Sequence, residues 1–226
     1  MLCPKSKLKK QKIYTSDYFS IIGVNISSKV IYITEKNIVK ALKTDGTVQK
    51  QKSITEENSI RGMAIGKNLL LENGANVYYG TMEKGIKKLA TVKTGDDWID
   101  KNTHIDLLGK YGDYIYGCVY GPYGSSVELM GYVFQIAVKT GKVLVYKEKS
   151  NCFLNDAKLT SQYIYVSDGS NTKKTICYRL DKKKGKIKRK VYSCGLDTTN
   201  GQNVYYVNNK EEKKKIVCFN TKKGKR

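Results

Sequence analysis

The stretch YIYVSDGSNTKKTICYRLDKKKGKIKRKVYS, residues 163–193, contains the pattern that predicts the fold. Three short runs rich in β-branched and aromatic residues are separated by polar residues, and a Lys-Gly turn at Gly185 precedes the last run. In that run Ile187 and Val191 fall on one side of a strand, and the lysines between them fall on the other. The basic cluster is therefore predicted to be a hairpin turn and an outer strand.

Four other segments repeat this order of strands and turns, namely residues 30–52, 69–93, 114–149 and 203–226. The five strand anchors are Tyr32, Leu71, Tyr116, Tyr165 and Tyr205, with separations of 39, 45, 49 and 40 residues. A period of about 40–50 residues with four short strands is typical of a β-propeller blade. We therefore predict an all-β fold, a single β-propeller domain over residues 1–226 with about five four-stranded blades. The predicted blades span residues 20–52, 59–93, 104–149, 153–193 and 195–224.

The last repeat ends at its turn and lacks an outer strand, whereas the segment QKIYTS at residues 11–16 resembles RKVYS at residues 189–193. We therefore predict that residues 9–16 form a closing outer strand that pairs with the strand around residues 215–220. Closure of the ring would hide sheet edges that an open array leaves exposed. The alternative is that the chain is part of a larger propeller.

The chain of 226 residues carries 42 basic and 20 acidic residues, which gives a formal net charge of +22. Arginines occur only at four positions (Arg61, Arg179, Arg189 and Arg226), so nearly all of the positive charge comes from lysine. Lysine is a flexible point charge, whereas arginine is the usual residue for bidentate contacts with phosphates and base edges. A solvated lysine surface is therefore favoured over a face that binds polyanions, and sequence-specific recognition of nucleic acid is disfavoured.

The six cysteines form no C-x-x-C pair and His104 is the single histidine, so neither a zinc site nor histidine-dependent nucleophilic catalysis is expected. No phosphate-binding or dinucleotide-binding glycine motif occurs, and no cofactor is expected. Cys177 and Cys218 lie in apolar runs and are predicted to be small buried hydrophobic residues, although a disulfide between neighbouring strands stays open.

The basic N-terminal stretch is followed by no apolar segment of a signal peptide, and no apolar run is long enough to span a membrane. Taken as given, the sequence predicts a cytoplasmic protein. A mature or truncated protein from outside the cell or from its surface would show the same features, so the compartment stays open.

Three aspartates, Asp106, Asp156 and Asp197, precede the second strand of their repeats, where the innermost strand of a blade is expected, and Arg61 lies near the comparable place. Carboxylates at a channel mouth could bind a cation, a sugar hydroxyl or a basic group. A glycosidase would need two of them to face each other across a substrate. The favoured interpretation is structural, with each aspartate capping the turn that enters its blade.

Two loops add aromatic candidates for ligand binding. Residues 94–104 hold three aspartates around Trp98, a pattern that lacks the features of a known calcium loop and favours an ordinary acidic connection. Residues 120–128 hold Tyr120 and Tyr123, whose rings could stack on a sugar or a peptide, although a long hairpin with exposed tyrosines is favoured.

The strand pairs resemble the uncharacterised propeller domains of Gram-positive bacteria, which are loosely similar to low-density-lipoprotein-receptor-type propellers. The residues involved are 163–166 with 177–181, 204–207 with 217–221, and 114–117 with 133–138. The resemblance implies the propeller fold, a frequent location on secreted or surface proteins, and no established catalysis. The Tyr-Trp-Thr-Asp signature of receptor propellers is absent from this sequence.

The leading functional hypothesis is a non-enzymatic binding or scaffold module that holds a protein or glycan through loops at one face. The first alternative is a sequence-blind binder of polyanions such as cell-wall polymer, membrane surface or nucleic acid. The second alternative is a carbohydrate-active enzyme that uses Asp106, Asp156 and Asp197.

Overall fold

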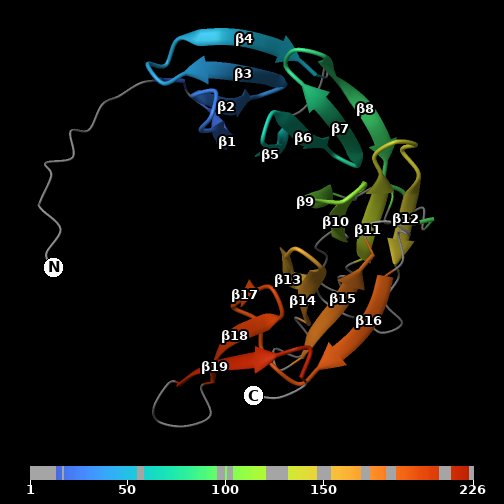
Figure 1. Cartoon of the computed structure of the whole chain (residues 1–226). Helices are drawn as coiled ribbons and strands as arrows, with labels where there is room; N and C mark the ends of the chain where they lie inside the picture. Colours follow the sequence, from blue (N-terminus) through green and yellow to red (C-terminus); the bar gives the residue numbers. More distant parts are fainter. Residues whose placement is uncertain are drawn as a thin grey trace, which may run out of the picture.

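The computed structural model describes residues 14–16, 18–54, 59–95, 100, 104–120, 132–146, 154–168, 174–181, 187–208 and 215–223. Nineteen strands in this part of the chain pair into five antiparallel sheets, each formed by strands that follow one another in sequence (Figure 1). The chain is therefore all-β and propeller-like, as the repeat pattern predicts.

The sheets are numbered first to fifth in chain order. The first contains β1 (Ser20–Asn25), β2 (Val30–Glu35), β3 (Ile38–Lys43) and β4 (Val48–Ser53). The second contains β5 (Arg61–Ile65), β6 (Asn68–Asn73), β7 (Asn76–Thr81) and β8 (Gly85–Thr91). The third contains β9 (His104–Tyr111), β10 (Tyr114–Tyr120), β11 (Tyr132–Ala137) and β12 (Val143–Tyr146). The fourth contains β13 (Leu154–Leu159), β14 (Tyr163–Asp168), β15 (Thr175–Leu180) and β16 (Ile187–Tyr192), and the fifth contains β17 (Thr198–Asn200), β18 (Asn203–Asn208) and β19 (Lys215–Asn220).

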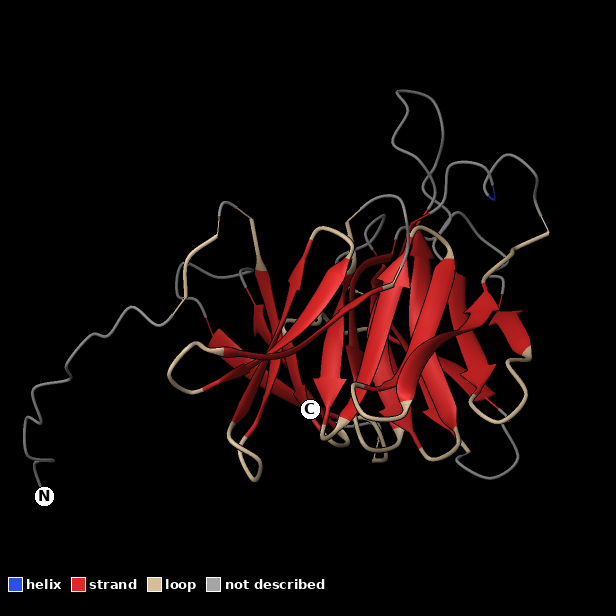
Figure 2. Ribbon diagram, turned by 90° about the horizontal axis from the view of Figure 1, so that it is seen from above, coloured by secondary structure: helices blue, strands red, loops and turns tan. Residues whose placement is uncertain are grey.

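Two of the turns that the repeat predicts, at Gly46 and Gly141, lie where the sequence places them, whereas the one at Gly185 lies outside the described residues. Gly46 and Gly141 lie between the third and fourth strands of their sheets and have φ angles of 89° and 68°, a left-handed region that suits glycine. A Cβ on Gly141 would also lie 2.4 Å from the carbonyl oxygen of Leu89, because this turn packs against the second sheet. Seen from above, the strands run across the molecule and their turns gather at its two faces (Figure 2).

The apolar core lies between sheets rather than at one centre. Alternating residues of each strand point to opposite faces, so an inner sheet contributes to two separate clusters. Four such clusters join neighbouring sheets: Val39 with Leu71, Leu70 with Phe134, Tyr116 with Ile164, and Tyr165 with Val204. Within the described ranges no cluster joins the fifth sheet to the first.

The sheets follow a C-shaped arc, with β1, β5, β9, β13 and β17 on its concave side and the first and fifth sheets at its two ends (Figure 1). The predicted closure by residues 9–16 is therefore not confirmed. A complete ring of exactly five blades is not confirmed either. Residues 9–13 lie outside the described part. Tyr14 and Ser16 contact Glu35 of β2 and belong to no strand.

This contact fastens the segment to the face of the first sheet that points away from the second. The Tyr14 hydroxyl donates to Glu35 Oε2 at 2.9 Å, and Lys40 Nζ donates to the Tyr14 hydroxyl at 3.0 Å. Lys40 and Ser16 also donate to the Glu35 carboxylate, and these hydrogen bonds, with that of Lys40 the strongest, lower the pKa of Glu35 to about 2. The segment thus caps part of the first sheet.

The cysteine predictions have a mixed outcome. Cys177 is buried, as predicted, and burial raises the pKa of its thiol to about 12. The prediction for Cys218 is wrong, because this residue lies opposite Tyr205 on the exposed face of β19. The cysteines of the described residues are free thiols. No helix in this part of the chain is long and apolar enough to cross a membrane.

Two anchor tyrosines at the same place in the repeat, Tyr116 and Tyr165, differ in the hydrogen bonding of their hydroxyl groups. The Tyr165 hydroxyl donates to the Gly201 carbonyl at 3.0 Å and lies 3.0 Å from Thr221 Oγ1, so it ties the fourth sheet to the fifth. The Tyr116 hydroxyl is buried and has no hydrogen-bond partner among the described residues.

We expect Tyr165→Phe to lower the free energy of unfolding by about 1 kcal/mol, because it removes a hydrogen bond between sheets. Tyr116→Phe should leave it unchanged or raise it, because that variant removes a buried hydroxyl without a partner. Urea unfolding of both variants measures the difference. Equal losses would show that Tyr116 also has a stabilising partner.

Candidate functional site

The inner strands place two of the predicted aspartates at equivalent positions. Asp106 of β9 pairs with Cys118, and Asp156 of β13 pairs with Ser167, in each case two residues beyond the anchor tyrosine of the neighbouring strand. The Asp106 side chain is exposed. Asp197 precedes β17, and its carboxylate accepts a hydrogen bond of 2.6 Å from the backbone N–H of Val207. This contact is made to β18 rather than to the turn that enters the blade.

Arg61 and Asp106 come together around a residue that the sequence reasoning missed. Glu72 of β6 lies directly opposite Arg61 of β5, and its Oε1 is 3.3 Å from Arg61 Nε. The Glu72 side chain is only 6% exposed, whereas that of Arg61 is 62% exposed. The other carboxylate oxygen, Oε2, is buried and has no hydrogen-bond partner within the described part of the chain.

Burial raises the pKa of Glu72 to about 7. The Arg61 charge and a hydrogen bond from the Leu107 backbone oppose this shift, and the Asp106 charge adds to it. The position that follows the anchor holds Ile33, Gly117, Val166 or Tyr206 in the other sheets, so Glu72 places a carboxyl group where its counterparts are not acidic. An acidic residue inside the apolar run LLLEN was the signal that could have identified it.

The structure does not show whether the aromatic residues of the two predicted loops could bind a ligand. Trp98 and Tyr123 lie outside the described residues, and Tyr120 is described only as the last residue of β10. Among the described side chains, no three His, Cys, Asp or Glu residues gather in a way that could hold a metal ion.

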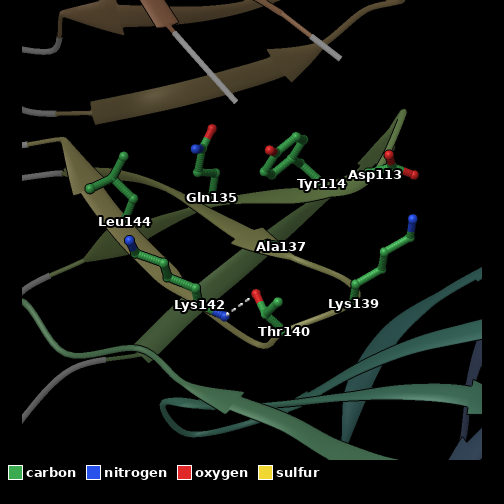
Figure 3. A pocket seen from close by; sticks show the side chains of 8 residues that line it. All are labelled: Asp113, Tyr114, Gln135, Ala137, Lys139, Thr140, Lys142 and Leu144. Atoms are coloured by element: carbon green, nitrogen blue, oxygen red, sulfur yellow. Dashed lines mark hydrogen bonds between the residues drawn. The ribbon is translucent and has the colours of Figure 1, made fainter. Parts of the chain in front are cut away.

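A pocket of about 430 Å³ opens on the third sheet, in a place that none of the predicted residues occupies (Figure 3). It is formed by β10, β11 and β12, by the turn between β9 and β10, and by the turn between β11 and β12. The lining residues are Asp113, Tyr114, Gln135, Ala137, Lys139, Thr140, Lys142 and Leu144. The pocket falls within the size range of small-ligand sites in proteins.

The strand register explains this lining. Tyr114 pairs with Ala137, and Gln135 pairs with Leu144, so these side chains share one face of the sheet. Gln135 is buried, while Lys139 and Lys142 are exposed on the turn after β11. Figure 3 shows Gln135 and Tyr114 standing on the same side of the strands, with the lysines nearer the turn. An apolar floor thus meets polar groups that can donate and accept hydrogen bonds.

Tyr116, whose buried hydroxyl has no partner among the described residues, is a neighbour of two lining residues but does not line the pocket itself. Tyr116 pairs with Gln135, and its ring centroid is 6.5 Å from that of Tyr114. Burial, with a smaller effect from neighbouring groups such as Tyr146, raises the pKa of Tyr116 well above its ordinary value. Burial also raises the pKa of Tyr146 to about 12. The phenols of Tyr116 and Tyr146 are therefore neutral hydrogen-bonding groups at physiological pH.

Comparison with known structures shows a propeller-like fold and no family. The chain is similar to dipeptidyl peptidase 4 of Porphyromonas gingivalis, with 8% identity, a TM-score of 0.54, and coverage of 90% of this chain and 38% of that one. It is also similar to a 6-phosphogluconolactonase-like protein of Bacteroides fragilis, with 12% identity, a TM-score of 0.47, and coverage of 79% and 55%. The chain thus spans about half of their length or less. No family model and no curated protein matches it.

Glu72→Gln should stabilise the protein above pH 7. The folded-state pKa of about 7 lies above the ordinary value of 4.5, so the folded state binds the proton more tightly than the unfolded state does. The wild type therefore loses stability as pH rises between those values, by up to about 3 kcal/mol, whereas the amide does not titrate.

Unfolding of the wild type and Glu72→Gln between pH 4 and pH 8 tests this expectation. Glu83→Gln is the control, because Glu83 is an exposed carboxyl group in the turn between β7 and β8. A difference between the wild type and Glu72→Gln that does not change with pH would mean that Glu72 titrates like an ordinary carboxyl group.

Proposed function

We propose that this protein is a non-enzymatic binding module that holds a glycan in the pocket of the third sheet. The observation that carries the proposal is the lining of that pocket, which combines the half-buried ring of Tyr114 with amide, carboxylate, hydroxyl and ammonium groups. Sugars present flat C–H faces beside hydroxyls that both donate and accept hydrogen bonds. In the pocket, the Tyr114 ring can contact the C–H face of a sugar, and the polar groups can bind its hydroxyls.

The way in which the polar groups are held supports the same proposal. Gln135 sits within a paired strand, and the Lys142 backbone N–H donates to the Thr140 hydroxyl at 3.3 Å within the turn. Groups held on paired strands and short turns lose little conformational freedom when a ligand binds. The resemblance to bacterial propeller domains without established catalysis agrees with a binding role.

Titration of a panel of neutral oligosaccharides, anionic polymers and DNA at about 50 and 200 mM salt tests the proposal, because counterion release weakens polyanion binding steeply over that range. We expect salt-resistant binding of at least one neutral glycan. Tyr114→Ala should weaken it at least about tenfold, since the variant removes the ring from the pocket. Val191→Ala, an exposed apolar residue of β16, is the matched control.

Retained affinity in Tyr114→Ala would place the glycan elsewhere. Binding that collapses with salt for every anionic polymer, without any neutral ligand, would favour the polyanion alternative. The exposed lysines of the outer strands, Lys50, Lys87, Lys88, Lys188 and Lys190, would then be its contact surface.

A carbohydrate-active enzyme is the second candidate, and one observation favours it. A carboxyl group with a pKa of about 7 can act as a general acid at neutral pH, and Glu72 lies near the second carboxylate of Asp106. Hydrolysis of aryl glycosides measures this activity. It should disappear in Glu72→Gln and Asp106→Asn but persist in Tyr114→Ala. Absence of hydrolysis in the wild type across the glycosides would contradict this candidate.

A further inference from the structure

The fifth sheet carries an apolar face that no described residue covers. One face of β18 and β19 packs on the fourth sheet through Val204 and Phe219. The opposite face carries Val207 paired with Ile216, and these side chains are 43% and 81% exposed. Cross-strand apolar pairs of this kind normally pack against another sheet.

The other end of the arc also has exposed apolar side chains, although Ile33 and Leu42 on the same face are buried. On the first sheet, Ile21, Val24 and Val48 are 64%, 57% and 42% exposed. Ile21 and Val24 pair with residues of β2 that point away from the second sheet. Tyr14 and Ser16 contact Glu35 of β2, and Tyr14 also contacts Lys40 of β3 and the ring of Phe19.

The distribution of exposed apolar side chains is not random. Eight of the ten large exposed hydrophobic residues in the described ranges lie on or beside the two end sheets. They are Tyr18, Phe19, Ile21, Val24, Ile26, Val48, Val207 and Ile216, whereas Leu144 and Val191 lie elsewhere. Concentrated apolar surface of this kind marks an interaction site.

We propose that a second copy of this chain docks on these ends, with the fifth sheet of each copy packed against the first sheet of the other. This contact continues the stacking of sheets that joins the first to the second sheet and each later sheet to the next. Each copy is C-shaped, and both of its ends are apolar. In a dimer with a twofold axis, the fifth sheet of each copy contacts the first sheet of the other, so that all four ends are covered.

Charge sets the conditions under which the pair forms. Each copy has a formal net charge of +22, so the two copies repel each other across solvent. Salt screens this repulsion while leaving the apolar contact in place. The association should therefore strengthen as salt concentration rises, which is the opposite of the salt response of polyanion binding.

Sedimentation equilibrium of the full chain between about 1 and 100 µM, at low and high salt, measures the association. We expect a dimer mass that increases with salt. Val207→Lys and Ile216→Lys should weaken the dimer at least about tenfold by placing a charge in the contact. Val191→Lys is the matched control, because Val191 is 41% exposed but lies on β16, and this variant should dimerise like the wild type.

A mixture of two variants identifies which faces meet. Val207→Lys damages only the fifth-sheet face, and Val24→Lys damages only the first-sheet face. Mixed together, the two variants can form one undamaged contact, so their mixture should associate more tightly than either variant alone. Circular dichroism confirms that each variant is folded.

A chain that stays monomeric at every concentration and salt condition would overturn the proposal. So would Val207→Lys that dimerises as well as the wild type while remaining folded. A mixture that associates no better than its components would show that like faces meet, and would also overturn the arrangement proposed here.

Discussion

Apolar packing between neighbouring sheets is the interaction on which the rest of the structure depends. A single sheet of short strands has too little buried surface to be stable in water. Here each inner sheet packs on both sides, and Leu70 and Leu71, adjacent in β6, enter two different cores because alternate residues face opposite ways. The same geometry fixes where polar groups can lie. A side chain that points into an interface must find a partner there, as Tyr165 does, or remain unsatisfied, as the Tyr116 hydroxyl and Glu72 Oε2 do among the described residues.

The two candidate sites follow from this constraint in different ways. The pocket of the third sheet lies where the strands meet their turns, so exposed lysines stand beside buried Gln135. The Glu72 carboxyl group lies between inner strands, where Arg61 supplies the nearest opposite charge and Asp106 adds a like charge. Because Glu72 is buried and Arg61 is largely exposed, the pair contributes little to stability: the loss of hydration of the carboxylate offsets its attraction to the guanidinium group. The energetic cost of retaining Glu72 is the ground for the second candidate function, in which this carboxyl group is the acid.

Much of the fold could be predicted from the sequence, because the repeat sets it locally. The anchors Tyr116 and Tyr165 and the turn glycine Gly141 lie where the period of the pattern places them. Contacts between repeats could not be predicted in the same way. Asp106 and Arg61 were identified singly, but Glu72, which brings them together, depends on the packing of β6 beside β9. Cys218 resembles Cys177 in its local sequence, yet Cys218 is exposed and Cys177 is buried. The fourth sheet has a neighbour on both sides, whereas the fifth sheet packs on one side only among the described residues.

The arc described above also has a consequence for the way the molecule opens. When each sheet packs only on the sheets before and after it, stability is approximately a sum of sheet terms and nearest-neighbour terms. An end sheet can then detach by breaking one such contact, whereas the third sheet must break two. The chain therefore behaves as a row that frays from its ends, with amide protection highest in the middle and lowest in the three-stranded fifth sheet. The first sheet frays less readily than its position alone suggests, since Tyr14 and Ser16 fasten the chain to it.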